Sequence, residues 1–138
     1  MSWFRRSRWH RRDDRGAAVP EFLMVSIVLI FLVMLIMQAI LYLYIRSVVV
    51  ASAAEGARYA ANADANPQGG GELASDRIAG GTSNAVAAEI ACEGSEQPGE
   101  AGATVVQVRC SGELPLFFAP MGNVLPLDVR AQALKEGG

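Results

Sequence analysis

The sequence predicts an α+β protein, in which one long N-terminal helix precedes a small domain with a short helix and an antiparallel β-sheet. Three observations lead to this class. The run from Phe22 to Ile45 is 24 residues long and contains no charge. Alanine-rich sequence without Pro or a Gly pair continues the helix to about residue 62. Farther on, Thr104–Cys110 and Val124–Ala133 alternate apolar and polar residues with the period of a β-strand.

The uncharged run at residues 22–45 has the length of a transmembrane helix. At about 1.5 Å per residue it reaches roughly 36 Å, against a hydrocarbon core of about 30 Å. The alternative is a buried core helix. A chain of 138 residues has too little other apolar surface to surround such a helix on all sides. We therefore predict a single membrane span, followed by an extracytoplasmic extension of the same helix.

Charge predicts the orientation of this span. Residues 1–16 contain six Arg and two Asp, a balance of +4, whereas residues 17–138 contain six basic and twelve acidic residues, a balance of −6. The positive-inside bias puts residues 1–16 in the cytoplasm, the span in the cytoplasmic (inner) membrane and the C-terminal domain outside the cytoplasm. Trp3 and Trp9 among the arginines also fit a nucleic-acid patch. The membrane span explains the same basic segment, so we expect no nucleic-acid partner.

Composition disfavours an enzyme. The chain has one His, His10, and two Cys, which cannot supply the four ligands of a zinc site within one chain. A Ser–His–Asp triad would need its base from the basic leader. Acidic residues of the C-terminal domain are scattered without a pairing pattern. We expect no catalytic residues, no cofactor and no metal.

Residues 15–22 read Arg-Gly-Ala-Ala-Val-Pro-Glu-Phe, at the cytoplasmic mouth of the predicted span. This stretch resembles the processing site of type IV prepilin-like proteins, which a membrane-embedded aspartyl prepilin peptidase cuts after the Gly. The resemblance implies cleavage between Gly16 and Ala17. Glu21 then becomes the fifth residue of the mature chain and, with Phe22, the expected assembly pair.

Two further stretches, residues 38–44 and residues 53–61, narrow the resemblance. The second reads Ala-Ala-Glu-Gly-Ala-Arg-Tyr-Ala-Ala, and both resemble the TadE-like proteins of tight-adherence (Flp-type) pilus loci. The resemblance implies a minor pilin or pseudopilin, a structural subunit and not an enzyme. Its implied partners are the membrane, prepilin peptidase, other pilin or pseudopilin subunits and the pilus assembly platform. TadE and TadF types stay alternatives, as do a place in the fibre and a place in a priming complex.

Glu21 has two interpretations. An acid in the first helical turn is favoured by the helix dipole by roughly 0.3–1 kcal/mol. In the second, its carboxylate pairs with the new α-amino group of Ala17, on the same or a neighbouring subunit, and sets the register of packed apolar helices. If the helix starts near Ala17, Pro20 lies in the first turn, where it costs little.

The extension of the helix carries small residues on one face. They lie at helical spacing and allow a close approach of another helix. That partner is either the chain's own C-terminal domain or a neighbouring subunit. The residues of this small-residue face are Val49, Ala53, Gly56, Ala57 and Ala60.

The C-terminal part shows alternating breakers and periodic segments. A cluster from Asn66 to Gly71 predicts a linker. A helix is expected over residues 72–91, interrupted near Gly80-Gly81, and a loop over residues 93–102. A turn is expected at Pro120–Asn123. The predicted organisation is thus a leader at 1–16, a long helix at 17–62, a linker at 63–71 and a small extracytoplasmic α+β domain at 72–138.

The two cysteines, Cys92 and Cys110, lie outside the cytoplasm in this topology, where disulfides persist. A bond between them closes a loop of 110 − 92 = 18 residues, worth roughly 3 kcal/mol on the chain-entropy model. The alternative is two buried free thiols.

A different class of function rests on Ala51-Ser52-Ala53, which reads as a signal-peptidase site. Cleavage after Ala53 would release an exported soluble binding domain. The N-terminus of the mature protein separates the two hypotheses: Ala17 for the pilin-like subunit, Ala54 for the released domain.

Overall fold

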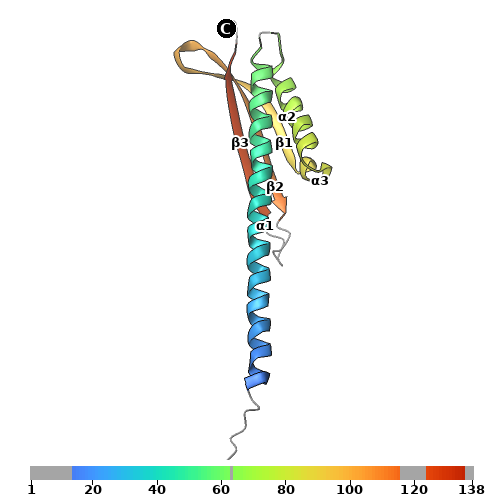
Figure 1. The fold of residues 1–138 in the computed structure, drawn as a ribbon. Coiled ribbons are helices and arrows are strands. Elements are labelled where there is room, and N and C mark those ends of the chain that lie inside the picture. Colours follow the sequence, from blue (N-terminus) through green and yellow to red (C-terminus); the bar gives the residue numbers. More distant parts are fainter. Residues whose placement is uncertain (1–13, 63, 116–123, 136–138) are drawn as a thin grey trace, which may run out of the picture. The chain divides into compact units, whose positions relative to one another are not determined.

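The computed structural model describes residues 14–62, 64–115 and 124–135 (Figure 1). It has the predicted α+β architecture, with a long helix, two shorter helices and a three-stranded antiparallel sheet. The chain divides into two units, residues 1–37 and residues 38–138, and α1 contributes to both. The elements are α1 (Asp14–Ala60), α2 (Pro67–Gly81), α3 (Asn84–Ala88), β1 (Ile90–Pro98), a 3-10 turn (Glu100–Gly102), β2 (Thr104–Pro115) and β3 (Val124–Leu134).

Helix α1 is one uninterrupted element of 47 residues. It begins three residues before the expected start at Ala17 and ends two residues before the expected end at residue 62. Strong helix formers, Leu, Met and Ala, supply 17 of its 47 residues, and Pro20 is the one proline inside it. Beyond its end, the amide of Ala61 still donates to the carbonyl of Ala57 at 3.0 Å, which closes the last turn.

Helix α2 corrects the prediction of a linker over residues 63–71, because residues 67–71 are helical. Asn66 is the N-cap, and its side chain accepts a hydrogen bond from the amide of Gln68 at 3.1 Å. Pro67 stands at the first helical position, where its missing N–H costs nothing. The same Asn-Pro pair that resembles a helix breaker therefore starts a helix.

The predicted interruption near Gly80-Gly81 is confirmed. Helix α2 ends there, and the Thr82 hydroxyl donates to the carbonyl of Ile78 at 2.7 Å. Ser83 then caps α3 by accepting a hydrogen bond from the amide of Val86. The end of α2 and the start of α3 each have a side-chain hydrogen bond, so two helices form where the sequence predicted one interrupted helix.

The sheet has the order β1-β2-β3, with β1 and β3 on its edges. Strands β2 and β3 lie where the alternation predicts them. Strand β1 corrects the expected loop at 93–102, since residues 93–98 pair with β2. Ala101, with φ of 56°, and Gly102 form the turn between β1 and β2. The turn expected at Pro120–Asn123 lies outside the described residues.

One face of the sheet forms the core of the C-terminal unit with α1 and α2, which lie side by side over it (Figure 1). On β2, Val106, Val108 and Cys110 are buried, whereas Arg109 between them is exposed. From Val108 onward the burial alternates with the predicted period of two, but Gln107, expected on the opposite face from Val106 and Val108, is also buried. Besides these strand residues, the core takes in Ile45, Val49, Ala53 and Ala57 from α1 and Ala74 and Ile78 from α2.

The structure joins Cys92 and Cys110 in a disulfide. The two residues are directly opposite each other in the register of β1 and β2, with their Cα atoms 4.1 Å apart. The bond therefore links an edge strand to the centre of the sheet. The described residues include no free cysteine.

Candidate processing and assembly segment

The predicted processing segment, Gly16 to Phe22, lies in the first turns of α1. Gly16 is exposed, and no atom of the described chain would come within 4 Å of a Cβ placed on it. Glu21 is also exposed, and Phe22 exposes 73% of its surface. The side of the helix that carries the predicted scissile bond is therefore open to another protein.

Because α1 begins at Asp14, Pro20 is not in its first turn. It lies seven residues into the helix, four residues after Gly16. A helical residue normally donates its N–H to the carbonyl four residues earlier, and Pro has no N–H. The carbonyl of Gly16 therefore has no such partner, and the expectation that Pro20 costs little there is wrong for the helix as it stands.

The stretch after Glu21 is apolar and uncovered by the chain. Helix α1 has the length and hydropathy to cross a membrane, with a mean hydropathy of 2.9 in its most apolar window. From Phe22 to Met37, every large hydrophobic side chain is at least 36% exposed. The hydroxyl of Ser26 donates to the carbonyl of Phe22 at 2.8 Å, so this polar group is satisfied within the helix. Such a surface fits a lipid environment.

Within the described residues, no basic side chain forms an ion pair with Glu21. Among the side chains that the structure describes, none supplies a cation to the predicted assembly residue. Ala17 and Glu21 are four residues apart on α1, which puts them on one face of the helix.

The small-residue face of α1 packs against the chain's own domain. Val49, Ala53 and Ala60 have no exposed surface, and Ala57 has 1%. A Cβ on Gly56 would lie 2.2 Å from the carbonyl oxygen of Gly70 in α2, so the two helices touch backbone to backbone. This contact decides between the two partners that the sequence left open for this face.

The comparison with protein families concerns the same helix. The family model described as TadE-like protein matches residues 16–58. This segment is TadE-like. The match begins at the glycine of the predicted processing site and ends at Arg58, so it spans the processing segment and the small-residue face as far as Ala57. Neither the search of curated proteins nor that of solved structures gave a match.

The TadE-like match and the apolar helix together indicate a pilus-related membrane protein with a single span. This confirms the family resemblance drawn from residues 15–22, 38–44 and 53–61. The disulfide and the α+β domain follow outside the matched segment, in the part of the chain that the family model does not cover.

Sequence reasoning missed that the TadE-like helix enters the domain before the predicted span ends. Ile45 is 5% exposed, in the core of the C-terminal unit. The hydroxyl of Tyr44 donates to the carbonyl of Gly81 at 3.0 Å, and that of Tyr42 to the carbonyl of Pro126 at 3.4 Å. Two tyrosines in an otherwise apolar run were the available signal, because a phenol near apolar surface usually finds a partner.

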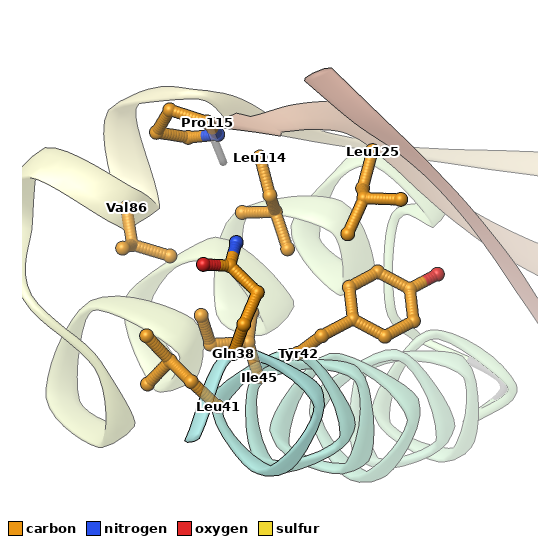
Figure 2. Close-up of a pocket in the computed structure, with 8 residues that line it drawn as sticks. All are labelled: Gln38, Leu41, Tyr42, Ile45, Val86, Leu114, Pro115 and Leu125. Carbon is orange, nitrogen blue, oxygen red and sulfur yellow. The ribbon is translucent and has the colours of Figure 1, made fainter. Parts of the chain in front are cut away.

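A small cavity lies beside Tyr42 (Figure 2). Its walls are apolar except for Gln38 and the ring of Tyr42. The amide of Gln38 points from α1 toward Leu114 and Pro115 of β2, and its Oε1 is buried without a hydrogen-bond partner among the described residues. None of the described residues that line the cavity is a carboxylate, a serine or a cysteine. Its lining is Gln38, Leu41, Tyr42, Ile45, Val86, Leu114, Pro115 and Leu125.

The exposed face of the sheet carries one charge cluster. Arg109 donates to Asp128 through Nε at 3.2 Å and Nη2 at 2.6 Å, and Arg130 lies 3.6 Å from the same carboxylate. The hydrogen bond from Arg109 lowers the pKa of Asp128. In the described ranges, no group of three or more His, Cys, Asp or Glu is placed to hold a metal ion.

Proposed function

We propose that this protein is a minor pilin or pseudopilin that helps assemble tight-adherence (Flp-type) pili. In this proposal, prepilin peptidase removes residues 1–16 on the cytoplasmic side of the inner membrane. The mature chain stays anchored by α1, with its domain outside the cytoplasm. It acts as a structural subunit, and its partners are other pilin or pseudopilin subunits and the assembly platform.

The observation that carries the proposal is the position of the processing motif. Gly16 and Glu21 stand at the exposed start of a TadE-like helix, directly before side chains that the chain leaves uncovered. A peptidase can approach Gly16 from the side because no atom of the described chain lies within 4 Å of a Cβ placed on it. Exposed apolar helix surface then remains for lipid and for the helices of other subunits.

Burial at Ala53 weighs against the alternative of an exported domain released after that residue. Ala53 has no exposed surface and lies inside a continuous helix. Cleavage there would also remove Ile45 and Val49 from the core of the domain. Losing several buried apolar side chains costs several kcal/mol, so the released domain would be destabilised.

Glu21 is the proposed assembly residue. An unpaired charge deep in a bilayer costs roughly 2.5–3.5 kcal/mol and less near the interface, so a carboxylate at the edge gains from a cation. The α-amino group of Ala17 created by cleavage is such a cation, on the same or a neighbouring subunit. With Phe22 beside it, Glu21 would set the register of packed helices.

The test replaces Glu21 by Gln, which removes the charge at nearly constant shape. We expect the Glu21→Gln chain to insert and to lose its leader. It should fail to co-purify with pilus partners and fail to restore piliation in a strain that lacks this protein. Glu55→Gln is the matched control, because Glu55 is an exposed acid of the same helix that pairs with Arg77 at 2.8 Å in the chain's own domain. Full piliation by Glu21→Gln would show that Glu21 is only a helix-dipole acid.

A further inference from the structure

We infer that Pro20 is a positioning residue for leader removal, because it keeps the peptide bond after Gly16 from being locked in the helix. The inference rests on the proposed cleavage between Gly16 and Ala17. It concerns how that bond becomes available to the peptidase. The observation behind the inference is a spacing, because Pro20 lies four residues after Gly16 inside α1.

In the structure the scissile bond lies within a helix. Helix α1 begins at Asp14, so the bond between Gly16 and Ala17 starts out helical. An aspartyl peptidase has to reach the carbonyl carbon of Gly16 and add water across the bond. A helical carbonyl that accepts a hydrogen bond from an amide four residues later is shielded on its oxygen. The helix must therefore open locally before cleavage.

Pro20 makes this local opening of the helix easier. Its nitrogen carries no hydrogen, so the carbonyl of Gly16 lacks the usual donor. Its ring also crowds the carbonyl four residues earlier, which is again that of Gly16. One residue thus weakens the helix at the carbonyl that the peptidase has to attack.

The weakening of the helix is confined to the start of α1. Gly16 itself disfavours a helix interior, and from Glu21 to Glu55 the helix has neither Gly nor Pro. The start of α1 is therefore its least stable part, while the apolar stretch that follows is held firmly. Opening at Gly16 need not disturb the membrane-spanning part, which has to stay helical in lipid.

The experiment follows leader removal of the full chain by pulse labelling in cells that contain the peptidase. Pro20→Ala restores the amide donor and a good helix former. One regained hydrogen bond corresponds to a slowing of about 2- to 12-fold, and relief of the ring clash adds to it. We expect leader removal to be about tenfold slower, with Val19→Ile, which leaves helix propensity nearly unchanged, as the control at wild-type rate. A Pro20→Ala chain that is processed within about twofold of wild type would overturn the inference.

A second variant separates helix opening from direct recognition of the proline ring. Adding Ala18→Gly to Pro20→Ala weakens the helix again without restoring the ring. We expect it to recover most of the wild-type rate, while Ala18→Gly alone leaves processing unchanged or slightly faster. No recovery would mean that the peptidase reads the ring, and the inference would be wrong.

A readout without peptidase tests the same claim. In full-length protein in nanodiscs, amide hydrogen exchange of residues 17–21 should be slower in Pro20→Ala than in wild type, while residues 45–60 are unchanged. Equal exchange would contradict the inference. These outcomes are distinct from failure of the proposed function, which would appear as a mature wild-type chain whose N-terminus is not Ala17.

Discussion

The contact between Gly70 of α2 and Gly56 of α1 should be essential to the domain. A Cβ on Gly70 would lie 2.6 Å from the carbonyl oxygen of Gly56 and 2.7 Å from the Cβ of Ala60. Ordinary van der Waals contact needs at least about 3.4 Å, so Gly70→Ala forces two helices apart by most of an ångström. Overpacking of this kind costs about 1–3 kcal/mol.

The control for this substitution lies in the same helix. A Cβ on Gly80 would meet nothing within 4 Å. Gly80→Ala should be neutral or stabilise by up to about 1 kcal/mol, because Ala is the better helix former. Gly70→Ala has the same gain in propensity, so the difference between the two variants isolates the helix–helix contact. We expect Gly70→Ala to be less stable than Gly80→Ala by about 1–3 kcal/mol.

Amide hydrogen exchange of the full-length protein in nanodiscs measures this difference. A free-energy difference of 1–3 kcal/mol corresponds to exchange of α2 and of the buried half of α1 that is about 5- to 150-fold faster. Fluorescence is a poor substitute, since both tryptophans, Trp3 and Trp9, lie in the leader. Equal exchange in the two alanine variants would refute the close approach of α1 and α2.

Three further perturbations test the rest of the domain. Replacing Cys92 and Cys110 together by Ser should destabilise the domain by roughly 3 kcal/mol, and two alkylatable thiols in freshly extracted native protein would show that the bond is not formed. Ala101→Gly should stabilise by up to about 1 kcal/mol, because Ala101 has φ of 56° and Gly adopts that conformation freely; a loss of thermal stability would count against it. Since Arg109 lowers the pKa of Asp128, the stability from that carboxylate is present above pH about 4 and is lost as pH falls through the lowered pKa. Asp128→Asn should therefore lose part of the acid-induced destabilisation in a pH series of unfolding, and an unchanged profile would exclude this role.

Much of the fold could be predicted from the spacing of apolar residues in the sequence. The uncharged run predicts α1, and alternation predicts β2 and β3. Burial of Val108 and Cys110 with Arg109 exposed between them confirms the face assignment for that part of β2, whereas Gln107, expected on the other face, is buried as well. Local patterns succeed over most of β2 because a sheet with one covered face imposes its period on the strand.

Where the prediction failed, the deciding contact is between elements far apart in the sequence. Residues 67–71 contain one Pro and three Gly, yet they are helical because α2 fits closely between α1 and β1. A Cβ on Gly71 would lie 2.9 Å from the carbonyl oxygen of Cys92, and one on Gly94 would lie 1.8 Å from the carbonyl oxygen of Pro67. Glycine there serves close approach, a property of the packed structure that propensity does not contain.

Strand β1 was missed for a related reason. Its residues from Glu93 to Pro98 are polar and include Gly94, a composition typical of a loop. As an edge strand it is largely exposed, and its register with β2 includes the disulfide between Cys92 and Cys110. Its pairing with β2, and not the burial of an apolar face, keeps this segment extended.

The candidate site was predictable in part. Its motif, from Gly16 to Phe22, is contiguous and could be read directly, and the family match begins at the same glycine. Sequence alone gave no partner for the small-residue face, because its burial against α2 depends on tertiary packing. The sequence also suggested that Pro20 lies in the first turn of the helix. In the structure α1 begins at Asp14, before the expected mature N-terminus, so Pro20 lies farther inside the helix.

The central claim is that this chain, whose residues 16–58 match the TadE-like model, is matured as a pilin-like subunit, and the intact mass of the protein extracted from membranes tests it most directly. The account predicts a mature chain that begins at Ala17, retains the whole apolar part of α1 and carries one intramolecular disulfide. In Gly16→Leu, the mass should rise by that of the attached leader. A mature chain beginning at Ala54, or an unchanged mature mass in Gly16→Leu, would contradict the account.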